Sequence, residues 1–384
     1  MTARALYVAF DVYPRPKGSS SHIASMVAAL ARDYAPVCVL CLGDGELPLR
    51  EAFAGGEIYR LPGTQRDVLG RATAFAQFVE GHAARLAGRL RLLVYRDPWG
   101  GVPAMRGAPA CPAIFEVNAL PSWELAYSRP GFAESATLRA KLGDMERHCL
   151  RMAGTVLCVS EVTRRALGCE EKSVVVRNAA SATYFEPGVC GLEVLASGEW
   201  CGYVGGLQAW QGVEFLVDAF AMTGRGRLLI VHSGNRGTRE LERRIGRLRL
   251  GDRVVLQGPL GAEELAGVMA RLRFTVAPLA ETARNTWQGC CPVKIVESMA
   301  TGTPVIASDL AVSRELITHG LDGWLVTAGD RRAWALGMER LFRDGALRDT
   351  LAANAKRTAG EKFSQPIAHE ELSRVFRRIE CRSR

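Results

Sequence analysis

The 384-residue sequence predicts an α/β protein with two doubly wound parallel sheets, and three observations lead to this fold class. Short apolar runs alternate with longer amphipathic stretches along the whole chain. The runs are continuously apolar, as in parallel strands buried on both faces. The scheme occurs twice, with a polar junction at 187–198. We therefore expect Rossmann-like domains at residues 1–187 and 188–364, with a C-terminal helix at 365–384 packing back on the first.

The expected strands and helices follow from this alternation in chain order. The expected strands are 5–10, 37–42, 92–95, 113–117, 155–159, 173–176, 200–204, 228–232, 254–257, 274–278 and 304–308. The expected helices are 22–32, 68–86, 134–152, 213–222, 239–248, 262–272, 293–301, 332–342 and 366–378. In such sheets ligands bind beyond the carboxyl ends of the strands, so we expect the two domains to face a shared cleft.

The composition is that of an ordinary globular protein, with 48% hydrophobic and 23% charged residues, which excludes a disordered or fibrous chain. The net charge is +9. A basic excess fits nucleic acid, an anionic membrane or a phosphorylated substrate, and it also fits a coding bias toward arginine. The arginine-rich segment 236–253 is interrupted by acids and lacks aromatic platforms. We therefore expect a solvated helix face there and no nucleic-acid partner.

The sequence predicts a cytoplasmic protein. The N-terminal apolar run is too short for a signal peptide, and no run reaches the roughly 18 apolar residues of a membrane span. The eleven cysteines follow no disulfide or zinc pattern, which favours reduced thiols. The amphipathic stretches 83–93 and 134–152 either pack on the sheet or rest on anionic lipid as a peripheral membrane contact.

The segment 291–309 carries the most specific chemistry. Pro292 suits the first position of a helix, so the amides of Val293 and Lys294 would point toward an anion. Lys294 adds a positive charge, and Glu297 follows one turn later, where a carboxylate can accept two hydrogen bonds from a ribose diol. Together these groups predict a nucleotide site. The alternative is an amphipathic helix with a surface Lys–Glu pair.

Two further loops have the glycines of phosphate-binding turns. Gly205 and Gly206 follow an expected strand, and Gly18 and Ser19 open a helix after the first strand. The first loop is an ordinary turn in the alternative interpretation, and the second a solvated loop with a serine cap. Neither loop has the spacing of a Walker A motif.

Three landmarks resemble those of a known family. They are "GYVGGL…W-x-G" from Gly202, "P-x-K-x-x-E-x-M-A-x-G-x-P-V-I-A-S-D" from Pro292, and "E-L-I-x-x-G-x-x-G-W-L-V" from Glu315. In order and spacing they are similar to those of the retaining GT-B glycosyltransferases of the large family 4 class, the glycosyl transferases group 1. The first half of the chain resembles the family more loosely.

The resemblance implies transfer of a hexose-type sugar from a nucleotide sugar, with UDP- or GDP-sugars as the expected donors, and retention of anomeric configuration. The implied acceptor is a lipid-linked, glycan or small-molecule one, in cell-envelope or exopolysaccharide synthesis. No metal or other cofactor is required in this interpretation. The alternatives are a natural-product glycosyltransferase, a nucleotide-sugar epimerase and a catalytically weakened member of the family.

The resemblance also assigns roles to single residues on the donor side. Glu297 matches the glutamate that binds the ribose hydroxyls. Gly289 stands where many members carry a second glutamate, so the backbone around Cys291 and Val293 is expected to contact the donor sugar.

The family's two diphosphate-binding cations are missing from their usual positions. Gly206 and Gln211 stand where the family has arginine and lysine. Lys294 is the expected replacement, and four other cations are candidate helpers. These helpers are Arg15, Lys17, Arg177 and Arg284.

On the acceptor side, Asn118 matches a histidine that often lies near the transferred sugar, and Glu116 lies two residues before it. The predicted catalytic group is therefore Lys294, Asn118 and Glu116. An asparagine can bond a sugar hydroxyl but cannot act as an acid or base. The scattered histidines, His22 among them, are expected to be structural.

Overall fold

A computed structural model describes residues 3–15, 18–63, 67–128, 134–234 and 237–382, which divide into two compact units. Unit 1 comprises the described residues of Met1–Arg15, Ser19–Val176 and His369–Arg384. Unit 2 comprises those of Pro16–Gly18 and Arg177–Ala368. The division at Val176 precedes the boundary between residues 187 and 188 that we derive from the sequence, and that boundary stays a prediction.

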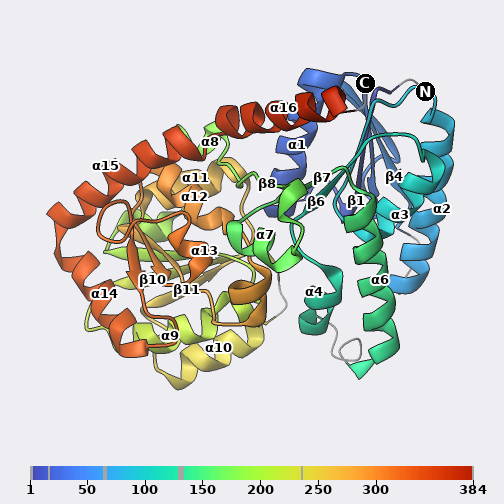
Figure 1. Ribbon diagram of the computed structural model, residues 1–384. Coiled ribbons are helices and arrows are strands. Elements are labelled where there is room, and N and C mark those ends of the chain that lie inside the picture. The colour runs from blue at the N-terminus through green and yellow to red at the C-terminus, as the bar shows by residue number, and fades with distance from the viewer. Residues whose placement is uncertain (1–2, 16–17, 64–66, 129–133, 235–236, 383–384) are drawn as a thin grey trace. The chain divides into compact units, whose positions relative to one another are not determined.

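Unit 1 contains a mostly parallel eight-stranded sheet in the order β3-β4-β2-β1-β5-β6-β7-β8, with β3 and β4 antiparallel (Figure 1). Its strands are β1 Ala5–Val12, β2 Val37–Leu42, β3 Arg50–Phe53, β4 Gly56–Leu61, β5 Leu92–Tyr95, β6 Ala113–Val117, β7 Thr155–Cys158 and β8 Ser173–Val175. Its helices are α1 Gly18–Tyr34, α2 Val68–Leu86, α3 Pro98–Gly107, α4 Pro121–Ser128, α6 Ala136–Met152, α7 Glu161–Leu167 and α16 Gln365–Arg382.

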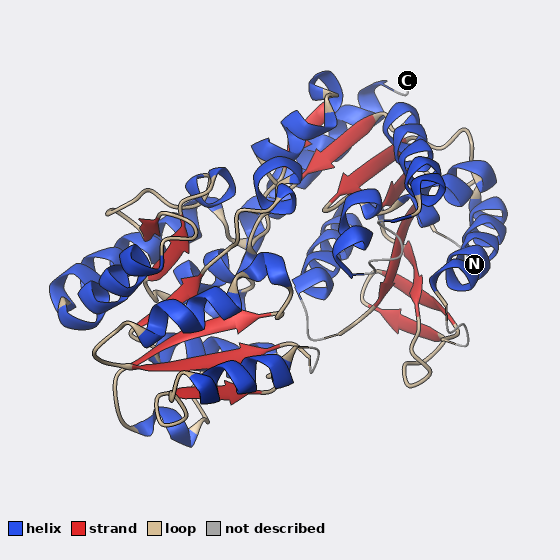
Figure 2. Cartoon of the chain, turned by 90° about the horizontal axis from the view of Figure 1, so that it is seen from below, coloured by secondary structure: helices blue, strands red, loops and turns tan. Residues whose placement is uncertain are grey.

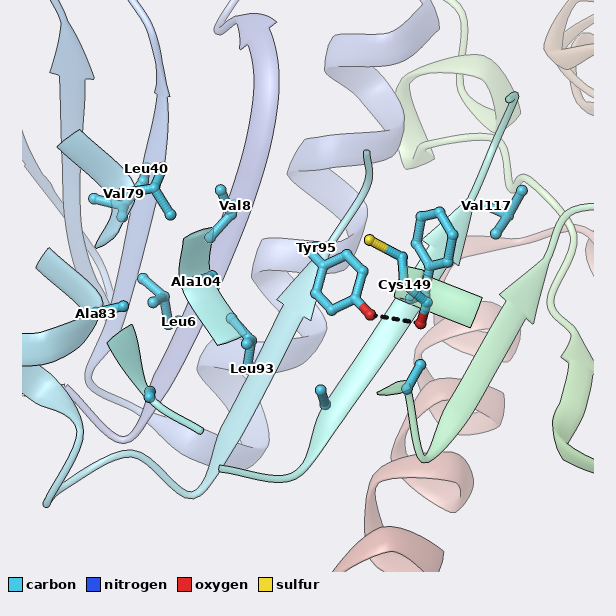
Figure 3. Close-up of a cluster of buried hydrophobic side chains, with 14 of the residues drawn as sticks. Leu6, Val8, Leu40, Val79, Ala83, Leu93, Tyr95, Ala104, Val117 and Cys149 are labelled. Carbon is cyan, nitrogen blue, oxygen red and sulfur yellow. Dashed lines mark hydrogen bonds between the residues drawn. The ribbon is translucent and has the colours of Figure 1, made fainter. Parts of the chain in front are cut away.

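Strand β1 shows why its sequence is continuously apolar. Successive side chains of a strand point to opposite faces of the sheet, so a strand covered on both faces needs apolar residues at every position. Leu6 and Val8 join a core formed with α2, α3 and α6, while Tyr7 and Ala9 join a core formed with α1 and α16. Figure 3 shows the first of these cores, in which the hydroxyl of Tyr95 donates to the carbonyl of Cys149 at 3.0 Å.

Unit 2 contains a six-stranded parallel sheet in the order β11-β10-β9-β12-β13-β14, and Figure 2 shows its strands side by side with helices along them. Its strands are β9 Trp200–Gly205, β10 Arg227–His232, β11 Val254–Gln257, β12 Phe274–Ala277, β13 Val305–Ser308 and β14 Trp324–Val326. Its helices are α8 Ala182–Phe185, α9 Val213–Ala221, α10 Thr238–Arg247, α11 Ala262–Arg271, α12 Val293–Thr301, α13 Ala311–Arg314, α14 Arg331–Arg343 and α15 Gly345–Lys362.

The two doubly wound parallel sheets predicted from the sequence are confirmed. The stretch 83–93, expected to be amphipathic, is not one helix: α2 ends at Leu86 and β5 begins at Leu92, and both residues are fully buried. This stretch therefore presents no apolar face to a membrane. None of the described helices is long and apolar enough to span a bilayer.

Candidate functional site

The side chains of unit 2 that the sequence predicts to bind a nucleotide gather where β9 and β12 end and α12 begins. Pro292 has an extended ψ of 98° and precedes the helix, so it lies one position earlier than expected. The amide of Ile295 already bonds the carbonyl of Pro292 at 3.0 Å. The amides of Val293 and Lys294 therefore belong to the first turn, where intrahelical acceptors are missing and an anion is favoured.

Lys294 extends from this turn onto the end of β9. Its ammonium donates to the hydroxyl of Tyr203 at 2.9 Å and to Oε1 of Gln211 at 2.7 Å. It also lies 4.1 Å from the centre of the Tyr203 ring, a cation–π distance. Burial removes water from the ammonium and lowers its pKa to about 7. The structure thus brings together Lys294 and Gln211, which the sequence predicted separately.

Gly205 is part of the same arrangement. Its φ of +140° lies in the region that favours glycine, and a β-carbon here would lie 2.8 Å from the Lys294 ammonium. A β-carbon on Gly206 would lie 2.1 Å from Oε1 of Gln208. The glycines predicted to approach a phosphate therefore also leave room for two polar side chains.

Glu297 lies one turn after Lys294 and is 8% exposed. Burial raises the pKa of its carboxyl group to about 7, although a hydrogen bond from the hydroxyl of Tyr184 and the charge of Lys294 oppose the rise. Tyr184 is itself buried, on the short helix α8. The carboxyl group of Glu297 is therefore buried and hydrogen-bonded. It does not form the exposed surface pair with Lys294 that the alternative interpretation predicted.

The loop before α12 is fixed by neighbouring polar groups. The amide of Asn178 donates to the carbonyl of Cys291 at 2.8 Å. Gly289 has a φ of +81°, and the side chain of Gln288 before it is 1% exposed. The backbone at Cys291 is therefore held in one conformation, as a loop that supplies amides to a ligand requires.

The candidate helper cations have different partners. Arg177 pairs with Glu315 at 3.1 Å, and Arg15 pairs with Asp44 in unit 1. The guanidinium of Arg284 lies 5.1 Å from the centre of the Trp210 ring. Lys17 lies outside the described residues.

In unit 1 the carboxylate of Glu116 is the centre of a buried polar cluster at the carboxyl ends of the central strands. It accepts the hydroxyl of Tyr7 at 2.9 Å and the amide of Asn118 at 2.6 Å. It also pairs with Nε2 of His22 at 2.5 Å and Nε of Arg96 at 3.3 Å. Burial acts to raise the pKa of Glu116, but these positive neighbours and hydrogen bonds hold it below its usual value.

The same cluster reaches the start of helix α1. A guanidinium nitrogen of Arg96 donates to the carbonyl of Ser19 at 3.4 Å, and the amide of Arg15 donates to Oγ of Ser20 at 2.9 Å. Gly18 begins helix α1. Arg96 thus connects Ser19 to Glu116, and Glu116 in turn bonds Asn118.

Sequence reasoning missed the aromatic and basic partners of the predicted residues. These are Tyr203 and Tyr184 in unit 2, and Tyr7, His22 and Arg96 in unit 1. Tyr203 and Tyr7 lie inside apolar strands, where nothing in the sequence separates a site hydroxyl from a core tyrosine. Only His22 carried a signal, because it follows the Gly/Ser run directly.

Residues 198–344 match the family described as "Glycosyl transferases group 1", and the resemblance predicted from the motifs is confirmed. The chain is also 32% identical over 180 residues to alpha-D-kanosaminyltransferase of Streptomyces kanamyceticus, and 33% identical over 132 residues to the amylovoran biosynthesis glycosyltransferase AmsK of Erwinia amylovora. These matches cover 46% and 34% of this chain. The chain spans less than half of each relative, 45% and 32% of their lengths.

Solved structures match almost the whole chain. Sucrose-phosphate synthase from Thermosynechococcus elongatus gives a TM-score of 0.80 at 20% identity, over 98% of this chain and 99% of that one. Anabaena HepE, solved in complex with UDP-glucose, gives 0.73 at 18% identity, over 97% and 99%. The glycosyltransferase WaaG gives 0.71 at 13% identity, over 96% and 98%. The fold class is therefore GT-B, as predicted.

Proposed function

We propose that the chain is a retaining glycosyltransferase that moves a hexose-type sugar from a nucleoside diphosphate sugar to an acceptor. The observation that carries the proposal is the first turn of α12. There, Lys294 and Glu297 lie one turn apart in a segment that matches a glycosyltransferase family. A UDP- or GDP-sugar is the proposed donor, and a complex of HepE with UDP-glucose supports the first of these.

On the donor side, Glu297 accepts hydrogen bonds from the ribose diol, and the amides of Val293 and Lys294 bind the diphosphate together with the Lys294 ammonium. Gly205 and Gly206 let the backbone approach the phosphates, and Gln211 orients the ammonium. The backbone at Cys291 contacts the donor sugar. Hydrogen bonds to a charged group contribute about 1.5–3 kcal/mol, so each of these contacts matters for binding.

The proposed chemistry is electrostatic. As the bond between sugar and diphosphate breaks, negative charge builds on the leaving phosphate and the sugar becomes oxocarbenium-like. A cation and helix amides already aimed at the phosphate stabilise this charge without reorganising. Retention of configuration is proposed from the family resemblance. The resemblance assigns no protein nucleophile. In this proposal Lys294 contacts the leaving diphosphate.

The acceptor is proposed to be a lipid-linked or glycan intermediate of cell-envelope or exopolysaccharide synthesis, which the name of the relative AmsK supports. In unit 1, Asn118 is proposed to bond an acceptor or donor hydroxyl. Glu116 holds Asn118 and His22 in place. Gly18 and Ser19 belong to the first turn of α1. Since Glu116 already has four partners, we propose that it positions these groups and does not take a proton from substrate.

A donor screen tests the proposal. Calorimetric titration with UDP, GDP, ADP and dTDP is expected to identify one nucleoside diphosphate that binds. Glu297→Gln is expected to weaken that binding by about 10- to 100-fold, because one carboxylate acceptor is lost and the remaining oxygen carries no charge. Glu281→Gln, at an exposed position, is the matched control. Absence of binding by every diphosphate would reject the proposal and favour an inactive member.

Incubation with the matching nucleotide sugar and an acceptor panel separates the remaining alternatives. Transfer to a lipid-linked or glycan acceptor is the expected result, with the anomeric configuration of the product read by NMR. Transfer only to small natural products, or conversion of the donor to an epimer, would replace the proposed reaction by one of the alternatives.

Peripheral membrane association is a separate part of the proposal. Helix α6 carries basic residues, and Met152 at its end is 57% exposed. Flotation with vesicles of anionic lipid is expected to retain some protein at low salt and to lose it at high salt. Absence of flotation at low salt would remove this part and leave the transferase proposal unaffected.

A further inference from the structure

We propose that Tyr184 is a positioning residue of the donor site, whose hydroxyl holds the Glu297 carboxylate in the orientation that accepts hydrogen bonds from the ribose diol. The inference rests on the proposed function, because it names the group that prepares Glu297 for the nucleotide. Its basis is the geometry of the segment 177–185, which lies at the start of the long stretch of unit 2 and ends in helix α8.

Tyr184 and Glu297 meet in the interior of unit 2, although they lie far apart in the sequence. Tyr184 is 5% exposed and Glu297 is 8% exposed, and the tyrosine hydroxyl donates to the carboxylate. Helix α8 packs against both α12 and α11, so the ring is held between helices. A carboxylate has about four acceptor positions, so one hydroxyl from Tyr184 leaves positions for two ribose hydroxyls.

The backbone that carries Tyr184 is anchored on both sides of this residue. Before it, the amide of Ala180 donates to the carbonyl of Phe363 at 2.8 Å. After it, the ring of Phe185 lies against α15, where a β-carbon on Gly360 would be 4.0 Å from the ring. The hydroxyl of Tyr184 therefore approaches Glu297 from a fixed backbone.

The two charged groups of α12 each have a tyrosine hydroxyl as a neutral partner. Lys294 and Glu297 lie one turn apart on one helix, at a spacing where opposite charges ordinarily pair with each other. Lys294 donates to the hydroxyl of Tyr203 at 2.9 Å, and Glu297 accepts from the hydroxyl of Tyr184. Because a hydroxyl carries no charge, it orients its partner without neutralising it, and the charge is kept for the ligand.

The electrostatics of Glu297 agree with this role. Burial raises the pKa of its carboxyl group to about 7, while the hydrogen bond from Tyr184 and the charge of Lys294 act to lower it. In α11, α15, β12 and β13, which also pack against α12, the residues described as buried are uncharged. The exposed Lys356 of α15 lies beside Gly302, at the far end of the helix. Loss of the Tyr184 hydroxyl is therefore expected to raise the pKa of Glu297 further.

Tyr184→Phe tests the inference, because it removes the hydroxyl and keeps the ring. The probe is the intact nucleotide sugar that the donor screen selects, with UDP-glucose tried first, and affinity is measured by calorimetry across the pH range. The carboxyl group is expected to become about tenfold harder to ionise. Affinity should therefore fall about tenfold at about pH 5.5, about fivefold at about pH 7 and less than about twofold at about pH 8.5. A loss of equal size at every pH would assign Tyr184 to packing alone and overturn the inference.

Coupling to Glu297 completes the test. In the Glu297→Gln background, Tyr184→Phe is expected to change affinity by less than about twofold, because the carboxylate through which it acts is gone. Tyr95→Phe is the matched control and should leave affinity unchanged, since it removes a buried hydroxyl of unit 1 that bonds the carbonyl of Cys149 at 3.0 Å. Circular dichroism confirms that each variant folds.

The outcomes separate this inference from the proposed function. If Tyr184→Phe leaves the pH profile of the wild type unchanged, or costs as much without the Glu297 carboxylate as with it, the positioning role is wrong and the proposed function stands. If the wild type binds no nucleotide sugar, the proposed function itself fails.

Discussion

At the scale of single residues, Lys294 and Glu297 make donor binding depend on pH in opposite directions. Burial lowers the pKa of Lys294 to about 7 and raises that of Glu297 to about 7. Above that pH the ammonium loses its charge, and below it the carboxylate is protonated. We expect wild-type affinity for the nucleotide sugar to peak near neutral pH and to fall on both sides, in calorimetric titrations from about pH 5.5 to about pH 8.5.

The single variants separate the two halves of this profile. Lys294→Met is expected to remove the decline above neutral pH, and Glu297→Gln is expected to remove the decline below it. The intact nucleotide sugar is the ligand, because its diphosphate diester has no group that titrates near neutrality. A wild-type affinity that rises or falls steadily across the range would contradict the assignment of the decline at high pH to Lys294 and the decline at low pH to Glu297.

Glu116 is the second residue whose environment makes a sharp prediction. Its carboxylate is 2% exposed and faces both His22 and Arg96. Removing one partner of a buried ionic cluster leaves an uncompensated charge, which costs about 3–5 kcal/mol. We expect Glu116→Gln to lower the free energy of unfolding by that amount in urea titrations followed by fluorescence and circular dichroism.

A surface pair gives the matched comparison for Glu116. Glu161 bonds Arg164 one turn away at 2.8 Å on helix α7, and both side chains are about one-third exposed. Glu161→Gln is expected to change stability by less than about 1 kcal/mol. Equal effects of the two substitutions would show that the cluster around Glu116 is not tightly coupled.

At the scale of elements, Gly205 links strand β9 to helix α12. A β-carbon here would lie 2.8 Å from the Lys294 ammonium and 3.1 Å from the Tyr203 hydroxyl, at a φ of +140°. Gly205→Ala is therefore expected to displace the ammonium and to weaken diphosphate binding about tenfold in calorimetry. In the Lys294→Met background the same change should cost much less, because the two effects are coupled. Gly258→Ala, where nothing lies within 4 Å, is the control.

The elements that sequence reasoning missed share a physical cause. Strand β3 is mostly exposed at the edge of its sheet and carries charges, and β14 has only three residues, so neither forms a buried apolar run. Helix α15 has little amphipathic periodicity, because only Leu351, Ala355 and Ala359 are buried and two of these are alanines. Strand β4 and the helices α3, α4, α7, α8 and α13 were not predicted either. The remaining strands were predicted because burial on both faces leaves a continuous apolar signal, and the remaining helices because their apolar residues recur at helical spacing.

The residues of the candidate site also divide into those that the sequence predicted and those that it did not. Lys294, Glu297 and Gly205 could be found because helix starts and strand ends carry recognisable residue types. Their partners could not, since Tyr203, Tyr184 and the other cluster members come from distant segments that only the fold brings together. The contact between Arg284 and the Trp210 ring belongs to this second group, because only the fold brings these two segments together, with Asn285 bonded to the carbonyl of Trp210.

At the scale of the whole molecule, the chain completes unit 1 with its last helix. After residues 177–368 have formed unit 2, the residues from His369 onward belong to unit 1. Phe376 on α16 is 1% exposed and meets the ring of Tyr34 on α1 edge to face, with centroids 5.9 Å apart. Ser373 bonds Asp33 and Arg32 on the same helix. A fragment that ends at residue 176 therefore lacks part of its own core.

We expect Phe376→Ala to destabilise unit 1 selectively. Truncating a buried phenylalanine costs about 3–5 kcal/mol, and the cavity would open in the core formed with α1 and β2. Hydrogen exchange measured by mass spectrometry should become faster in α1 and β2, while β9 and β10 in unit 2 keep their protection. Arg377→Ala, at an exposed neighbouring position, should change neither unit. Equal loss of protection in both sheets would mean that the units unfold as one, and unchanged exchange in α1 would mean that α16 contributes little to its stability.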